Sequence, residues 1–134
     1  MKLIILISTL LFNSYLYGHG GNKPGPNGGK IKMPGMFHTE LLLNGPHHFQ
    51  IYLLDMKFKE PMTEKSTVHY SLNGGKKSLC VPQNKYFSCK TKKMIKKGSI
   101  IKVHAKRLNQ KGTATYKNLM RKMKKKMKHN MNHH

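Results

Sequence analysis

The stretch HFQIYLLD, residues 48–55, decides the fold because its apolar and polar side chains alternate with the two-residue period of a β-strand. Residues 67–72 and 99–106 repeat this alternation. The apolar faces of the three segments predict a common core. Its nine members are Phe49, Ile51, Leu53, Val68, Tyr70, Leu72, Ile101, Val103 and Ala105.

Short strand-like segments recur along the chain, and residues typical of turns, such as NGP at 44–46 and NGG at 73–75, separate them. Strands at this spacing are typical of β-sandwiches. The sequence therefore predicts an all-β fold, a small immunoglobulin-like β-sandwich of about seven strands over residues 36–117. The predicted strands are residues 36–43, 48–55, 67–72, 76–81, 85–90, 99–106 and 113–117.

Four histidines fall on the polar phase of the predicted strands. Their positions are His38, His48, His69 and His104, and Glu40 shares the phase of His38. Any one of them fits an exposed strand position that tolerates histidine. Whether they meet depends on the strand order, which the sequence leaves open.

The charge balance is strongly basic: in 134 residues, 26 Lys and Arg stand against 4 Asp and Glu, for a net charge of +22. This length fits one small domain with tails and excludes a large multi-domain enzyme. Four carboxylates are too few for an acidic catalytic cluster. The charge predicts attraction to polyanions of any kind.

The first 18 residues have the pattern of a secretory signal peptide, with one early lysine, an apolar run over residues 3–12 and Gly18 at the end. An uncleaved anchor is the alternative, but the run is about half the length needed to span a bilayer. Cleavage after Gly18 leaves His19 first, and cleavage after Gly20 is the rival. We expect a periplasmic or secreted protein with a Gly/Pro-rich arm at residues 19–35.

Export determines how Cys80 and Cys89 are interpreted, because two cysteines in an oxidising compartment usually pair. We predict a disulfide between neighbouring strands, which would stabilise a small core. A free thiolate metal site is the alternative.

The C-terminal tail, residues 118–134, is basic and has methionines at helical spacing. We expect a disordered tail that becomes helical on binding. Thioether and imidazole ligands together favour copper or silver ions. Insertion into an anionic membrane surface is the alternative. The candidate ligands in the tail are Met120, Met123, Met127, His129, Met131, His133 and His134.

A second group of candidate metal ligands surrounds the arm. If cleavage leaves His19 first, its free amine and imidazole form a chelating pair for Cu(II), which a further histidine completes. The candidate ligands of this group are His19, Met33, Met36, His38, His47 and His48.

Catalysis and nucleic-acid binding have little support. Nucleophilic catalysis needs a base and an orienting acid, and acids are scarce. The chain has no glycine-rich phosphate loop and no zinc-finger spacing. Export and the lack of a basic stacking motif disfavour nucleic acid as a partner. We therefore expect a protein that is not an enzyme.

Four segments carry a resemblance to a known domain: PNGGKIKMPGMFHTEL at 26–41, FQIYLLDMKFKEP at 49–61, STVHYSLNGG at 66–75 and GSIIKVHAKRLNQKG at 98–112. Together they resemble the small β-domain of periplasmic adaptor subunits of heavy-metal efflux pumps. In that pattern a His-Gly-Gly opening leads into a strand with an acidic residue. Asn27-Gly28-Gly29 and Glu40 stand at these positions here.

The resemblance implies a periplasmic β-sandwich that handles metal, has no catalytic activity and has a metal-efflux component as partner. Asn27 departs from the pattern by removing a possible ligand, and the sequence has no coiled-coil or lipoyl-like part. The tail is similar to Met/His-rich silver- and copper-binding periplasmic proteins. The leading hypothesis is an exported protein that buffers or delivers copper or silver ions. The alternative is a cationic protein whose tail docks on an anionic envelope or another polyanion.

Overall fold

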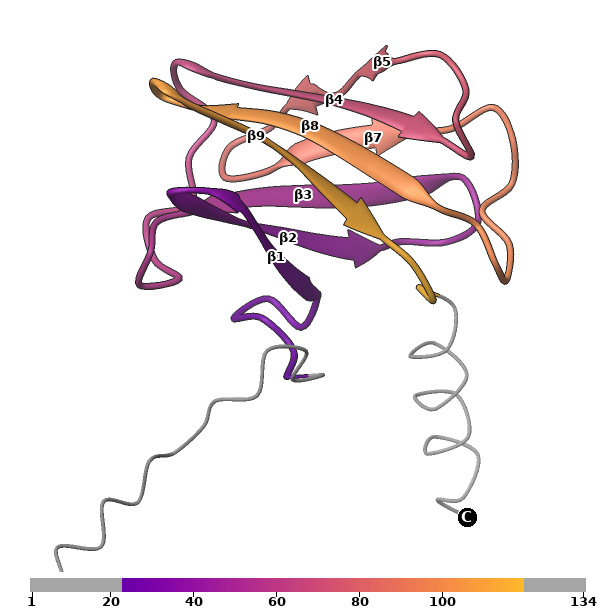
Figure 1. Ribbon diagram of the computed structural model, residues 1–134, viewed down its shortest axis with the longest axis horizontal. Coiled ribbons are helices and arrows are strands. Elements are labelled where there is room, and N and C mark those ends of the chain that lie inside the picture. The colour runs from indigo at the N-terminus through magenta and orange to yellow at the C-terminus, as the bar shows by residue number, and fades with distance from the viewer. Residues whose placement is uncertain (1–22, 120–134) are drawn as a thin grey trace, which may run out of the picture.

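The computed structural model describes residues 23–119, and this part of the chain folds into nine strands without a helix (Figure 1). They form two antiparallel sheets, one in the order β1-β2-β3-β7-β6 and the other in the order β5-β4-β8-β9. The predicted all-β sandwich is confirmed. The strands are β1 (Lys30–Gly35), β2 (Phe37–Leu43), β3 (His48–Leu54), β4 (Ser66–Leu72), β5 (Ser78–Leu79), β6 (Val81–Pro82), β7 (Phe87–Lys90), β8 (Ile101–Arg107) and β9 (Gln110–Tyr116).

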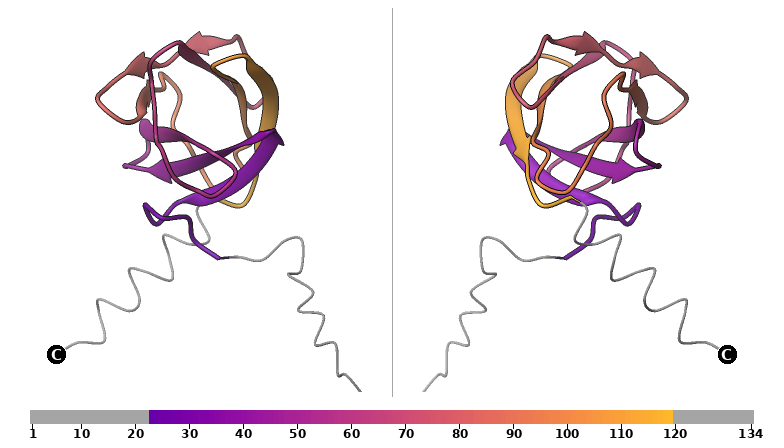
Figure 2. Two further views of the ribbon diagram at one scale, coloured as in Figure 1. Left: turned by 90° about the vertical axis from the view of Figure 1, so that its left-hand side faces the viewer. Right: turned by 90° about the vertical axis from the view of Figure 1, so that its right-hand side faces the viewer.

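The core lies between the two sheets, which curve around it when the molecule is viewed from one end (Figure 2). Eight of the nine predicted core residues are buried, and Leu72 is partly buried. Phe49 of β3 meets Tyr70 of β4 edge-on, with the ring centroids 5.1 Å apart. The alternation read from the sequence therefore placed the apolar face of each central strand correctly.

The expected arm contributes to the sandwich, because residues 30–35 form β1. Strand β1 pairs with β2 and also lies against β9, the edge strand of the other sheet. Glycine permits this approach: a Cβ at Gly112 would lie 2.2 Å from the Pro34 carbonyl oxygen. Near the same edge, the buried Tyr116 hydroxyl donates to the Thr39 carbonyl oxygen at 2.9 Å and so joins the two sheets.

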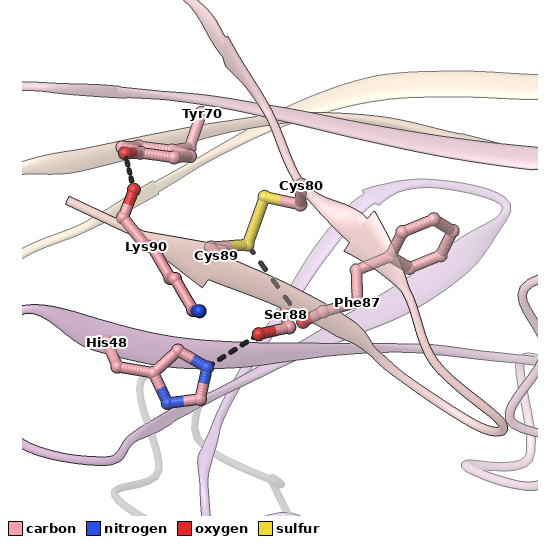
Figure 3. Close-up of a disulfide and its surroundings, with 7 residues drawn as sticks. All are labelled: His48, Tyr70, Cys80, Phe87, Ser88, Cys89 and Lys90. Atoms are coloured by element: carbon pink, nitrogen blue, oxygen red, sulfur yellow. Dashed lines mark hydrogen bonds between the residues drawn. A yellow bond between two sulfur atoms is a disulfide. The ribbon is translucent and has the colours of Figure 1, made fainter.

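The opposite edge is where the chain crosses between the sheets. The predicted strand at 76–81 is two short strands, β5 in one sheet and β6 in the other, with Cys80 between them. Cys80 is joined by a disulfide to Cys89 of β7, and both residues are fully buried (Figure 3). The predicted disulfide is confirmed, and it fastens the crossover to the neighbouring strand.

Several expectations fall on residues 1–22 and 120–134, which lie outside the described part of the chain. They are the signal peptide, the candidate ligand His19 and the ligands of the tail from Met120 onward. Within residues 23–119, no helix is long and apolar enough to cross a membrane.

Candidate functional site

The outer face of β2 is covered, although the sequence placed His38 and Glu40 on the polar phase of this strand. Glu40 is fully buried and His38 is 7% exposed. The turn before β1 covers Glu40, which accepts hydrogen bonds from the Asn27 and Gly29 backbone N–H groups at 2.9 and 2.8 Å. The ring of Phe58, from the β3–β4 loop, stacks on His38 with the centroids 4.0 Å apart. Both covers come from outside the strand, so alternation alone could not predict them.

The β3–β4 loop holds His38 through a tight turn at Asp55. The Asp55 carboxylate accepts the backbone N–H groups of Lys57 and Lys59, both at 2.8 Å. The Asp55 carbonyl oxygen accepts the Phe58 N–H at 3.1 Å and lies 3.0 Å from His38 Nδ1. Phe58 takes a positive φ of 61°, which turns its ring back onto the histidine. Asp55 and Phe58 are therefore the residues of this site that the search for ligand types missed.

The hydrogen bond to Asp55 decides which nitrogen of His38 is available. A carbonyl oxygen only accepts, so Nδ1 carries the proton and Nε2 of the neutral ring carries a free lone pair. Among residues 23–119, Nε2 has no hydrogen-bond partner, so it is the ring nitrogen left for an ion, on a residue that is 7% exposed. A histidine whose Nδ1–H is held by a carbonyl oxygen has the usual arrangement of a metal ligand.

Three exposed methionines share this end of the sandwich with His38, and one of them, Met56, directly follows Asp55 and is 43% exposed. Met36, in the β1–β2 turn, is 65% exposed, and Met33 of β1 is 57% exposed. The β1–β2 register runs from Lys32 opposite Thr39 to Gly35 opposite Phe37, so Met33 and Pro34 together face His38 across a β-bulge. We call Met33, Met36, His38, Asp55 and Phe58 the histidine end.

The acidic residues also concentrate at the histidine end. Asp55, Glu60 and Glu64 all follow β3 before β4 begins. The pKa of Asp55 is held below its usual value, mainly because the Lys59 N–H donates to the carboxylate, with the Lys57 N–H and the Arg107 charge adding to the effect. The Asp55 carboxylate therefore stays ionised beside the candidate ligands at neutral pH.

His47 and His48 lie at the other end of the molecule. The β2–β3 register places His38 opposite Leu54, so His48 is six residues away along β3, about 20 Å. His48 Nε2 lies 2.6 Å from Ser88 Oγ (Figure 3), and His47 Nδ1 lies 3.1 Å from the Thr91 carbonyl oxygen. These two histidines cannot share an ion with His38.

Two other strand histidines come together in the second sheet. His69 of β4 is directly opposite His104 of β8, and Thr113 Oγ1 of β9 lies 3.2 Å from His104 Nδ1. The pKa of His104 is lowered by partial burial and by the charges of Lys77, Lys102 and His69. Among residues 23–119, no three His, Cys, Asp or Glu side chains gather into a metal-binding group. An ion bound within residues 23–119 therefore needs ligands of another kind, and the exposed methionines of this part of the chain are Met33, Met36 and Met56 near His38 and Met94 at the opposite end.

The end of the sandwich opposite His38 is formed by the connections at residues 44–47, 73–77 and 91–100 (Figure 1). These segments contain no Asp or Glu. We call these three connections the lysine end, after the six lysines that they carry: Lys76, Lys77, Lys92, Lys93, Lys96 and Lys97.

No family model, curated protein or solved structure matches the chain.

Proposed function

We propose that this chain is an exported protein without catalytic activity that binds copper- or silver-type ions, with one binding position at the histidine end. The observation that supports it is the unpartnered Nε2 of His38 in β2, beside the exposed Met36 of the β1–β2 connection and the exposed Met33 of β1. His38, Met36 and Met33 are the proposed ligands. The Met/His tail would supply further ligands.

The donor set decides which ions are favoured. Thioether sulfur is soft and uncharged, and it suits Cu(I) and Ag(I), while imidazole nitrogen serves both. A net charge of +22 repels every cation, but a monovalent ion meets half the repulsion that a divalent ion meets. The ionised Asp55 beside His38 offsets part of that repulsion. We therefore place Cu(I) and Ag(I) ahead of Cu(II) and Zn(II) at this position.

The Asp55 turn prepares His38 for binding before an ion arrives. The hydrogen bond to Nδ1 and the stacked Phe58 ring together fix the orientation of the imidazole. A ligand that is already oriented loses less freedom on binding. This gives Phe58 and Asp55 a positioning role, while the methionines of the bulge remain free to adjust.

One further observation supports export. The buried disulfide is typical of proteins from oxidising compartments, which fits a periplasmic or secreted location. The partner that we propose, a component of a metal-efflux system, rests on the sequence resemblance to efflux adaptor domains.

The test is native mass spectrometry of the full mature chain with Ag(I) and with Cu(I), in the presence of a dilute competing chelator. The variant Met33→Leu/Met36→Leu removes both thioethers from exposed positions, so the fold should be unaffected. We expect it to retain one ion fewer than the natural chain. His38→Gln should give the same loss.

Matched controls exist elsewhere in the same chain. Met94→Leu removes a similarly exposed methionine from the lysine end, and His48→Gln removes a strand histidine that is bound to Ser88. Neither should change the number of ions retained. An unchanged stoichiometry in both histidine-end variants would contradict the proposed position. Loss of every ion on changing the four tail methionines to leucine would move the function to the tail.

A further inference from the structure

The loop between β7 and β8 is fixed to the body of the protein. The Ile95 side chain is 1% exposed, and its backbone N–H donates to the Pro46 carbonyl oxygen at 2.7 Å. At the end of the loop, the Ile100 N–H donates to Asn73 Oδ1 and the Asn73 N–H donates to the Ile100 carbonyl oxygen, both at 2.8 Å. These contacts hold the lysine-rich loop in one conformation against the sandwich.

This surface combines positive charge with exposed apolar side chains. The loop reads KKMIKK over residues 92–97, so four lysines flank a Met-Ile pair. Ile95 points into the core, while Met94 is 49% exposed and the nearby Ile100 is 39% exposed. A hollow of about 340 Å³ lies beside them, lined by Asn73, Lys93, Met94 and Lys96. Lys76 and Lys77 of the β4–β5 connection add two charges to the same end.

Surface lysines alone usually do no more than keep a protein soluble. Here the apolar tips distinguish the lysine end, because a purely soluble polyanion offers them nothing to contact. A bilayer with anionic lipids offers both partners, since its phosphates attract lysines and its acyl boundary takes up methionine and isoleucine. Nucleic acid is disfavoured because residues 44–47, 73–77 and 91–100 contain no Phe, Tyr or Trp on which a base could stack.

We propose that the lysine end docks on an anionic lipid surface, with Met94 and Ile100 entering the boundary between headgroups and acyl chains. The six lysines then lie against the phosphate groups, and the fixed loop sets the depth of entry. Docking in this way points the histidine end away from the membrane (Figure 1). This activity goes beyond metal binding, because none of its residues belongs to the proposed metal position.

The absence of tryptophan from the chain allows a direct test. The variants Met94→Trp and Met36→Trp each place one fluorescent reporter at an exposed methionine, the first at the lysine end and the second at the histidine end. Both are made in the full mature chain and mixed with vesicles of phosphatidylglycerol and phosphatidylcholine. We expect the emission of Trp at position 94 to move to shorter wavelength and to be quenched by brominated lipid. Emission from position 36 should stay unchanged.

The basic tail also attracts anionic vesicles, and the reporters separate its contribution from that of the lysine end. If the chain sediments with vesicles while both reporters remain in water, the tail alone binds and the proposal is wrong. A shift at position 36 instead of position 94 also overturns it. An equal shift at position 94 with heparin would replace the lipid with a soluble polyanion, which likewise overturns it.

A charge variant adds an independent readout. Lys92→Gln/Lys93→Gln/Lys96→Gln/Lys97→Gln should weaken partitioning onto phosphatidylglycerol vesicles at least about tenfold, because each lysine near an anionic membrane contributes to binding. A matched control is Lys57→Gln/Lys59→Gln/Lys106→Gln/Lys111→Gln, which removes the same charge from elsewhere in the sandwich. An equal loss in the two variants would show that net charge, and not the lysine end, drives binding.

Discussion

The two ends of this sandwich are held by different chemistry. The lysine end is fixed by a buried aliphatic side chain, Ile95, and by hydrogen bonds between neutral groups at Asn73. The histidine end is fixed by the Asp55 carboxylate, which closes the loop that covers His38. Carboxylates titrate and aliphatic side chains do not, so of the attachments through Asp55 and Ile95 only the first should respond to pH.

The ends also differ in their surface charge. Three acids lie in the β3–β4 loop beside basic residues, whereas the connections of the lysine end carry six lysines and no acid. A chain with a net charge of +22 therefore still has one region where a cation meets nearby carboxylates. The fold separates the position that we propose for a soft monovalent ion from the surface that we propose for an anionic membrane.

The largest effect is expected from Ile95→Ala, which tests whether Ile95 anchors the loop of the lysine end. Truncating a fully buried isoleucine should lower the free energy of unfolding by about 2–5 kcal/mol, because it removes apolar contacts and leaves a cavity. The matched control is Ile100→Ala, at a side chain that is 39% exposed, where the loss should be much smaller. Urea denaturation measures both. Equal, small losses would show that Ile95 does not anchor the loop.

Next in size is the effect of Glu40→Gln, which tests the polar attachment on the other side. The amide keeps the size of the side chain but presents an NH₂ group to N–H donors, and hydrogen bonds to a charged group contribute about 1.5–3 kcal/mol. We expect a loss in this range, together with faster amide exchange at Asn27 and Gly29, which now bond to Glu40. Glu64→Gln, at an exposed residue, is the control. Unchanged exchange at both amides would show that the turn before β1 is held by other contacts.

These two attachments show which features of the fold can be predicted from the sequence alone. The period of two identified the core strands, because phase is a local property of each segment. The expected export, together with the turn residues between Cys80 and Cys89, predicted the disulfide, and these are also local signals. The features that were not predicted depend on contacts with a segment that is distant in the sequence.

Residues 30–35 illustrate this limit, because Pro34 and the flanking glycines are typical of an arm and only the neighbouring strands make the segment a strand. Glu40 and His38 were predicted correctly in phase but are buried by the turn before β1 and by Phe58. The pairing of His69 with His104 required the strand order. One local signal for the histidine end was present in the sequence: an aspartate directly after a strand favours a turn that bonds its own loop.

Acid should loosen the histidine end before the lysine end. The pKa of Asp55 is lowered in the folded protein, so its contribution to stability is present above the unfolded pKa, about 4, and is lost as the pH falls through the lower folded pKa. Protection factors from amide exchange measure the effect, because they remove the intrinsic pH dependence of exchange. We expect protection at Lys57 and Lys59 to fall in this range while protection at Ile95 persists.

The control for this prediction is Asp55→Asn, which keeps an accepting Oδ1 but cannot titrate. Protection at Lys57 and Lys59 in this variant should not depend on pH in the same range. A parallel acid loss at Ile95 in the natural chain would mean that the two ends open together, and the contrast between them would fail.

The smallest expected effect is electrostatic, and it shows whether the positive charge of the lysine end influences His104 in the second sheet. Burial lowers the pKa of His104 most, and the charge of Lys77 lowers it further, so Lys77→Gln should move this pKa upward toward its usual value. A proton titration followed by NMR at the His104 ring reports the shift, with Lys111→Gln as a control of equal charge. Because the pKa is lowered on folding, stability declines as the pH falls below about 6.5 and stops declining below the folded pKa. That decline should be shallower in Lys77→Gln. An unchanged pKa in Lys77→Gln would show that the charge of the lysine end does not reach His104. The lowered pKa would then come from burial, Lys102 and His69.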